Sequence, residues 1–116
     1  MEPYMKNIPF STVLSIAEQV DYMAGQVVSK TIAQNKAVSL TLFAFDAGEE
    51  ISTHASDGDA MVIALDGHGE ITVAGEKHSL VPGDMIVMPH HKPHAVYAPD
   101  RFKMFLVVVF PEIVKE

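Results

Sequence analysis

The sequence predicts an all-β fold, either a sandwich or a barrel, and three observations support this. After residue 26, most of the chain alternates apolar and polar side chains with a period of two, which is the period of a β-strand. Short segments rich in Gly, Pro and Asp separate these runs, and such residues favour turns. The 116 residues fit a single domain with a core of its own.

A short helical turn is the first element that the sequence predicts, over Val13–Gln19, where apolar residues recur at helical spacing. Ser11 or Thr12 is expected to cap its start, because a hydroxyl oxygen there can accept a backbone N–H. The period then changes to two, and nine strands are expected. They are Val27–Ala33, Val38–Phe45, Ile51–Ser56, Met61–Leu65, Glu70–Val73, Lys77–Val81, Met85–Met88, Ala95–Tyr97 and Phe102–Val109.

Two segments are apolar at successive positions, so that both faces of their strands are apolar: Met61–Leu65 and Met104–Phe110. A strand of this kind usually lies between two layers, and one of these layers can be a partner subunit. We therefore expect a homodimer. The strand Val27–Ala33 is a candidate to extend the edge of a partner's sheet, which would close an open edge.

Composition excludes several classes of protein. Eight Lys and Arg against fifteen Asp and Glu give a net charge of −7, and such a protein repels the phosphates of nucleic acids. The absence of Cys excludes disulfides, thiolate metal sites and a cysteine nucleophile. The longest apolar run, Met104–Phe110, is far shorter than the roughly 18–20 residues of a membrane-spanning helix. The N-terminus lacks the pattern of a signal peptide, so a cytoplasmic location is expected.

Two segments about thirty residues apart carry the most specific pattern. In the first, Gly48 is followed at fixed spacing by His54 and Gly67, and in the second, Gly83 is followed by Pro89 and His94. These spacings resemble the two motifs of the cupin superfamily, whose members are small double-stranded β-helix (jelly-roll) barrels. The resemblance implies a single cupin domain over residues 1–116. Residues 1–36 would form an N-terminal segment and edge strand, and residues 37–110 the barrel.

In metal-binding cupins, two His and one Glu of the first motif and one His of the second motif hold a divalent ion. Two of these positions are kept here, as His54 and His94, whereas Ser56 and Ala60 replace the other two. The second motif also departs from the family at His91, where Gly is usual, and at Ala98, where Asn is usual. The resemblance therefore implies His54 and His94 as candidate ligands of one divalent transition metal (Zn, Ni, Fe or Mn), bound weakly or not at all.

Strand alternation predicts which side chains line the barrel. His54 and Ser56 share a face of their strand, and Val62 would continue that wall on the next strand. His94 and Met104 would join them from later strands. We therefore predict a small-molecule cavity with His54, Ser56, Val62, His94 and Met104 in its lining.

A catalytic zinc usually has three protein ligands and a water, so two imidazoles are one ligand short. Ser56, Asp59, His90 or His91 would have to supply the third. Asp59 is expected outside the pair, because its parity is opposite to that of Ala60. His90 and His91 follow Pro89 in a loop, and a position at the rim is expected for them.

Three functions remain open on this basis, and no catalytic residue is assigned. The first is a small-molecule-binding or sensing barrel that uses His54, His94 and Ser56. The second is a metal-dependent cupin enzyme, an oxygenase or isomerase, with an open coordination position. The third is a metal-free enzyme similar to sugar epimerases, with His94 or His54 as general base. The replacement of two ligands favours the first function over the second.

Overall fold

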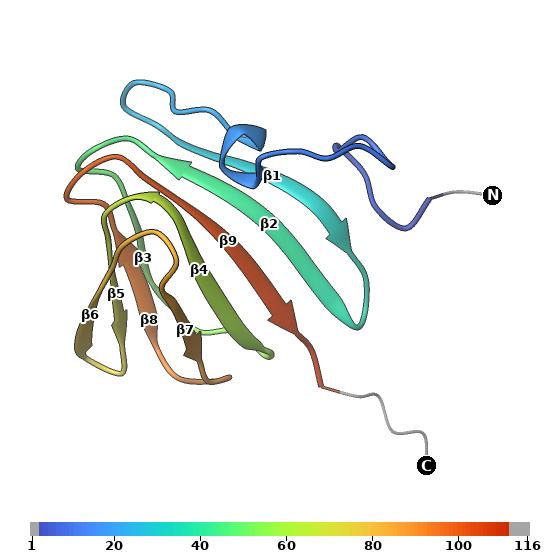
Figure 1. The fold of residues 1–116 in the computed structure, drawn as a ribbon. Coiled ribbons are helices and arrows are strands. Elements are labelled where there is room, and N and C mark those ends of the chain that lie inside the picture. The colour runs from blue at the N-terminus through green and yellow to red at the C-terminus, as the bar shows by residue number, and fades with distance from the viewer. Residues whose placement is uncertain (1–2, 112–116) are drawn as a thin grey trace, which may run out of the picture.

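Two antiparallel sheets that face each other make up the fold (Figure 1). The structure is a computed structural model that describes residues 3–111. One sheet has the strand order β1-β2-β9-β4-β7 and the other has the order β3-β8-β5-β6. The strands are β1 (Val27–Gln34), β2 (Val38–Phe45), β3 (Glu50–His54), β4 (Asp59–Gly67), β5 (Gly69–Val73), β6 (Glu76–Leu80), β7 (Met85–Met88), β8 (His94–Tyr97) and β9 (Phe102–Val109). The predicted all-β fold is confirmed, and a strand occupies each predicted segment.

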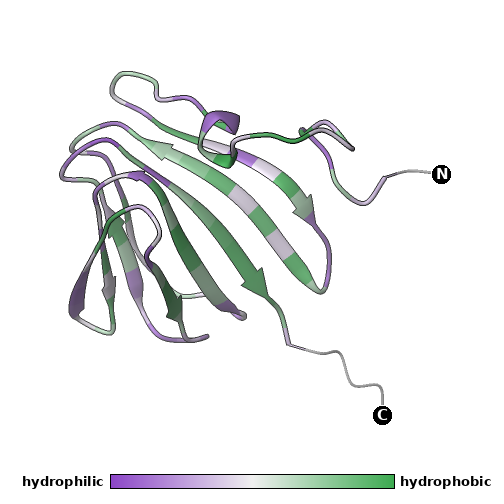
Figure 2. Ribbon diagram, viewed as in Figure 1, coloured by the Kyte–Doolittle hydropathy of each residue, from purple (hydrophilic) through white to green (hydrophobic). Residues whose placement is uncertain are grey.

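The main core lies between the inner faces of the two sheets. Strand β4 contributes every second residue to it, namely Ala60, Val62 and Ala64, while β9 contributes Phe102 and Met104. All five side chains are at most 2% exposed. Burial of each larger apolar side chain stabilises the fold by about 1.5–3 kcal/mol. Figure 2 shows that the apolar residues are concentrated in the central strands of the larger sheet.

A second core lies on the outer face of the five-stranded sheet, under the N-terminal segment (Figure 1). Val20 of that segment packs there against Ile32 of β1 and Leu42 of β2. Two lysines of the sheet point toward the same segment. The Lys30 ammonium donates to the carbonyl of Gln19 at 3.1 Å, and that of Lys103 donates to the carbonyl of Ala17 at 2.6 Å. The segment thereby covers this face over β1 and β2 and reaches the start of β9.

The predicted helical turn is wrong in extent and in its cap. Only Ile16–Gln19 is helical, as a single 3-10 turn (η1), and no side chain caps it. The hydroxyl of Thr12 instead donates to the carbonyl of Phe10 at 3.0 Å. Val13 is fully exposed, so the first part of the segment has no buried face to stabilise a longer helix. Within residues 3–111, no helix is long and apolar enough to cross a membrane.

Candidate functional site

His54 and His94 are direct neighbours at one end of the smaller sheet. His54 is the last residue of β3 and His94 the first of β8, and the two are paired across these strands. Their Nε2 atoms lie 3.1 Å apart, and their rings meet edge to face with centroids 4.3 Å apart. His94 is only 3% exposed, whereas His54 is exposed at the end of its strand. The two predicted histidines are therefore brought together.

A β-bulge in β3 makes this pairing possible. Ile51 pairs with Val96 and His54 pairs with His94, so β3 uses three steps where β8 uses two. Without the extra residue, Thr53 would stand opposite His94. Bulges re-aim side chains in this way next to functional sites. Because of the bulge, Ile51 and His54 both lie on the inner side of the sheet. Ile51 also packs against the main core.

The hydrogen-bond partners assign a proton to each ring. Nδ1 of His54 lies 2.9 Å from the Ser52 carbonyl, which can only accept, so this nitrogen carries the proton. Nε2 of neutral His54 is then an acceptor, and Nε2–H of His94 donates to it. Nδ1 of His94 is buried and makes no hydrogen bond of normal geometry, although the Lys92 backbone acts on the ring. The pair is thus a single N–H···N bond with one unsatisfied nitrogen behind it.

Burial is the main cause that lowers the pKa of His94 below its ordinary value of 6.5. The nearby His54 lowers the pKa of His94 further, and the Lys92 backbone opposes both effects. Since the charged form is disfavoured, His94 is neutral at pH 7, in agreement with its role as the donor of a neutral pair.

The other predicted cavity residues occupy different surroundings. Ser56 lies beyond the end of β3, and its hydroxyl donates to the Gly58 carbonyl at 2.7 Å rather than to an imidazole. Val62 and Met104 are buried on the inner wall, at 0% and 1% exposure, within the main apolar core. Their contact with a ligand stays a prediction.

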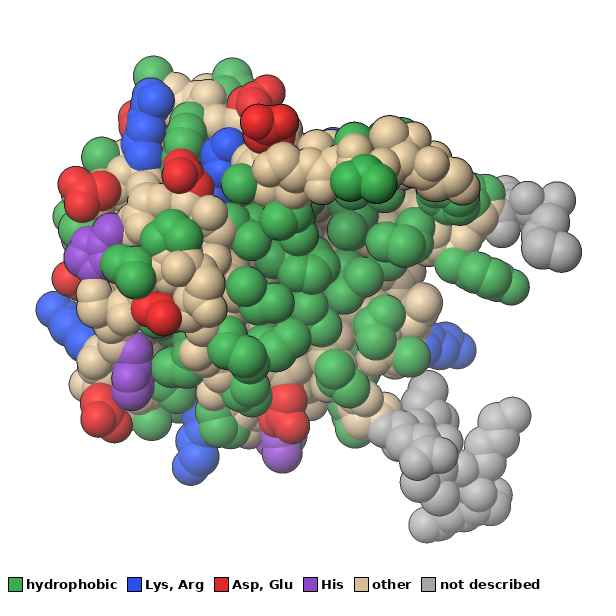
Figure 3. Space-filling view, viewed as in Figure 1, with side chains coloured by type: hydrophobic (Ala, Val, Ile, Leu, Met, Phe, Trp, Pro, Cys, Tyr) green, Lys and Arg blue, Asp and Glu red, His purple; other side chains and the backbone are tan. Residues whose placement is uncertain are grey.

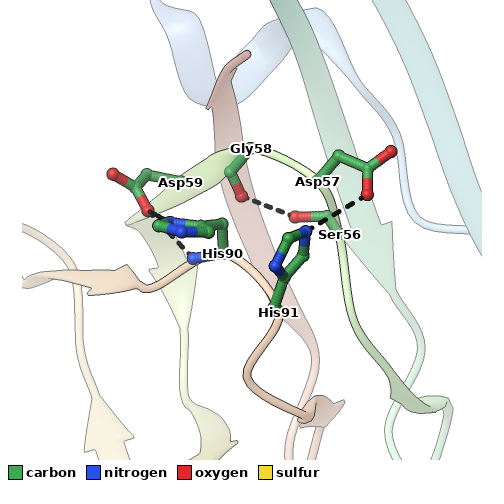
Figure 4. A network of polar contacts seen from close by, with 6 residues as sticks. All are labelled: Ser56, Asp57, Gly58, Asp59, His90 and His91. Carbon is green, nitrogen blue, oxygen red and sulfur yellow. Dashed lines mark hydrogen bonds and ion pairs between the residues drawn. The ribbon is translucent and has the colours of Figure 1, made fainter. Parts of the chain in front are cut away.

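Two Asp–His pairs join the loops that lead into the histidine pair (Figure 4). Asp59 accepts from both the backbone N–H and the ring Nδ1 of His90, at 2.9 and 3.0 Å. Nε2 of His91 lies 3.4 Å from the carboxylate of Asp57. We call these four residues the clasp. It ties the β3–β4 loop and the first residue of β4, which follow His54, to the β7–β8 loop, which precedes His94.

The clasp borders a pocket of about 590 Å³ that is also lined by Gly58, Val109, Phe110 and Pro111. Hydrogen bonds from His90 hold the pKa of Asp59 below its usual range. Asp59 thus lies outside the histidine pair, in line with its parity, and the exposed His90 and His91 line this pocket. Their pairing with two aspartates was missed from the sequence. The sequence did contain a signal for this pairing, because two Asp lie within five residues of His54 and two His lie within four residues of His94.

The donor set does not fit a resident metal ion. Two imidazole nitrogens on one tetrahedral zinc lie about 3.3 Å apart, since each Zn–N bond is about 2.0–2.1 Å, so the spacing of His54 and His94 alone is suitable. However, residues 3–111 contain no group of three His, Cys, Asp or Glu side chains placed to hold an ion. The Nδ1 of His94 also lacks the hydrogen bond that usually orients a metal-bound imidazole.

His68 lies near a serine and an aspartate at another turn, without the geometry of a catalytic triad. Its Nε2 contacts the hydroxyl of Ser79, but its Nδ1 is 3.8 Å from the carboxylate of Asp100, too far for a hydrogen bond. The Asp100 side chain is 77% exposed. An aspartate so placed does not hold the imidazole in one orientation.

The lowered pKa of His94 predicts a pH dependence of stability. The unfolded chain binds a proton at His94 near pH 6.5 and the folded chain does so only at lower pH, so the free energy of unfolding falls as pH decreases below about 6.5. For His94→Gln we expect this slope to be shallower by up to about 1.4 kcal/mol per pH unit. Urea unfolding between pH 8 and 5 measures it.

Asp59→Asn is the control for this experiment. The pKa of Asp59 is lowered on folding, so its contribution is present above the unfolded pKa of about 3.9 and is lost only as pH falls further. The Asn variant should change the acid limb and leave the slope near pH 6 intact. Equal slopes near pH 6 for the native protein and His94→Gln would contradict the assigned state of His94.

Comparison with known proteins places this geometry in a family. The Cupin domain family matches residues 41–110. A conserved protein of unknown function from Streptococcus pyogenes is 42% identical, with a TM-score of 0.93 over 97% of this chain and 98% of that one. A cupin superfamily protein from Desulfitobacterium hafniense is 34% identical, with a TM-score of 0.88 over 92% of this chain and 98% of that one. None of the curated proteins matches the chain.

A third similar structure is a Cupin 2 conserved barrel domain protein from Leptotrichia buccalis. It is 36% identical, with a TM-score of 0.81 over 83% of this chain and 47% of that one. The family match covers most of the chain, including both histidines of the pair. Together with the two facing sheets, these likenesses show that the chain belongs to the cupin family.

Proposed function

We propose that the chain is a cytoplasmic cupin that binds or senses a small molecule, with the His54–His94 pair as the polar anchor of its site. The direct Nε2–Nε2 hydrogen bond carries this proposal. It joins an exposed ring to a buried one, so a ligand that reaches His54 from solvent can exchange the imidazole–imidazole bond for bonds to itself. The buried, unsatisfied Nδ1 of His94 marks the inner end of the same pair.

The surroundings of the pair favour a mostly apolar ligand with one polar group. The inner wall beyond the histidines consists of apolar side chains, among them Val62 and Met104. Pockets for small molecules typically combine such a lining with a few polar groups that fix orientation. A hydroxyl, carbonyl or carboxylate group on the ligand would meet the imidazoles, and Ser56 would have to release the Gly58 carbonyl to join them.

A metal-dependent cupin enzyme is the alternative that one observation favours, namely the Nε2–Nε2 spacing of 3.1 Å, which is close to that of two ligands on one ion. A metal-free enzyme similar to sugar epimerases has less support. Its general base would normally be oriented by a carboxylate, whereas the partners of the two rings are each other and the Ser52 carbonyl.

Ligand binding is tested by thermal unfolding in the presence of a panel of small organic acids, sugars and aromatic compounds. A ligand at 100 times its Kd stabilises the folded state by about 2.7 kcal/mol, so true ligands raise Tm clearly. We expect at least one compound to stabilise the native protein but not His54→Gln/His94→Gln. A panel without such a compound, or compounds that stabilise both proteins equally, would contradict the proposal.

Metal content separates the two leading functions. We expect the native protein, purified without chelator or affinity metal, to hold well under one equivalent of divalent metal. Ser56→His with Ala60→Glu should bind zinc or nickel much more tightly, because added ligands in a rigid barrel cost little further entropy. The readouts are mass spectrometry and metal titration.

The control adds His94→Gln to the double variant, which should abolish the gain in affinity. One full equivalent of metal in the native protein would favour the enzyme instead. An unchanged affinity in the double variant would show that the two positions do not face the histidine pair.

A further inference from the structure

His54 lies at the end of a strand whose own ladder holds it weakly. The strand order β3-β8-β5-β6 places β3 at the edge of the smaller sheet. In the pairing of β3 with β8, only Glu50, Ile51 and His54 have partners, because the bulge leaves out the two residues between them. Ser52, Thr53 and His54 are exposed, so no apolar packing fixes the strand beyond Ile51. A strand end with so few contacts opens locally at little cost.

His94 is held much more firmly. Its strand, β8, lies between β3 and β5, so His94 pairs with His54 on one side and with Val73 on the other. The side chain of His94 is buried. The carbonyl of Pro93, the residue before it, accepts a hydrogen bond from the N–H of Ala74 at 2.8 Å. The sheet therefore fixes His94, and whatever fixes His54 decides whether the pair forms.

The clasp ties down the residues that follow His54 (Figure 4). Its side-chain pairs join its two aspartates to His90 and His91. A backbone bond adds to them, since the N–H of His91 donates to the Ser56 carbonyl at 2.9 Å. His91 has a φ of +63°, a left-handed conformation that is disfavoured for a residue with a Cβ atom. Such strain persists only where surrounding contacts hold it, as these bonds do at His91.

The same loop is also held against the end of β9. A Cβ atom on Gly58 would lie 2.5 Å from the carbonyl oxygen of Val109 and 2.8 Å from the side chain of Val108, so only Gly fits this close approach. Figure 3 shows apolar side chains over the larger sheet, with acidic and histidine side chains toward the margin of that surface. The four side chains of the clasp are exposed, so they hold the loop by polar contacts rather than by apolar packing.

We propose that the clasp is the positioning element of the site: it places His54 opposite His94, while the sheet places His94 independently. This role rests on the proposed function, because it serves the same ligand site. The clasp acts through the backbone, since its side chains pair with one another and not with the two rings. Loss of the clasp should therefore free His54, leave His94 in place and break the N–H···N bond while both imidazoles are still present.

Nitrogen-15 NMR of the protein without ligand, at about pH 8, is the experiment. The variant Asp57→Ala/Asp59→Ala removes both carboxylates of the clasp. In the native protein, the shifts of Nδ1 and Nε2 of His54 should differ widely, because its ring is held in one tautomer. In the variant, the His54 ring exchanges between tautomers, so this difference should become at least twofold smaller or change sign. The backbone amide signal of His94 should stay at its native position.

Two further variants are the controls. Asp59→Asn keeps an oxygen that can accept from His90, so it should restore the native spectrum of His54. Asp100→Ala also removes an exposed carboxylate near a histidine, since Asp100 lies 3.8 Å from His68, but it does so at a different turn. This second control should leave the His54 signals unchanged.

Two results would overturn the proposal. His54 signals that are the same in the Asp57→Ala/Asp59→Ala variant, in Asp100→Ala and in the native protein would show that the clasp does not place this ring. Equal changes at His54 and His94 would show that the clasp supports the whole sheet rather than one side of the pair. If circular dichroism shows that the double variant is unfolded, Asp59→Ala alone takes its place. Because no ligand is added, the result is independent of the ligand panel that tests the proposed function.

Discussion

The packing on both faces of the five-stranded sheet depends on the pairing of β4 with β9. Both strands carry apolar side chains on both faces, with Val62 and Met104 directed inward and Ile63 and Phe105 outward. The inward residues fill the core between the sheets and hold the smaller sheet, with its histidines, against the larger one. The outward residues extend the apolar surface on which the N-terminal segment packs. One strand pair thus positions the site on one side and presents an apolar surface on the other.

The histidine pair on the smaller sheet depends on local features of the strands and loops around it. The bulge in β3 brings His54 opposite His94, and the clasp ties together the two loops that enter and leave the pair. The bulge and the clasp lie at the same end of the fold. The resulting site holds one neutral hydrogen bond between imidazoles, whereas the metal-binding members of the family surround an ion with four side chains. Ser56 and Ala60 stand at the positions where those members have their other two ligands, so the polar content of this site differs from theirs.

The sequence was sufficient for the strands and insufficient for the details of the site. Alternating patterns and turn residues located the nine strands that residues 3–111 form, because burial of one face enforces a period of two. Alternation also predicted that Asp59 points away from the pair. It could not reveal the bulge after Ile51, since one extra residue in a strand leaves no compositional mark, nor that β3 ends at His54, two residues before Ser56. The helical turn was overextended because Val13 and Ile16 have helical spacing but no buried surface to pack on. The clasp depends on contacts about thirty residues apart, which pattern alone does not specify.

The central claim is that the pair is a neutral imidazole–imidazole hydrogen bond rather than two lone pairs directed at an ion. Nitrogen-15 NMR of the histidine side chains at about pH 8 tests it directly, because the shifts of Nδ1 and Nε2 report which nitrogen carries the proton. We expect His54 to be protonated at Nδ1 and His94 at Nε2. Protonation of both rings at Nδ1 would leave two lone pairs converging on one point, as in a metal site, and would contradict the claim.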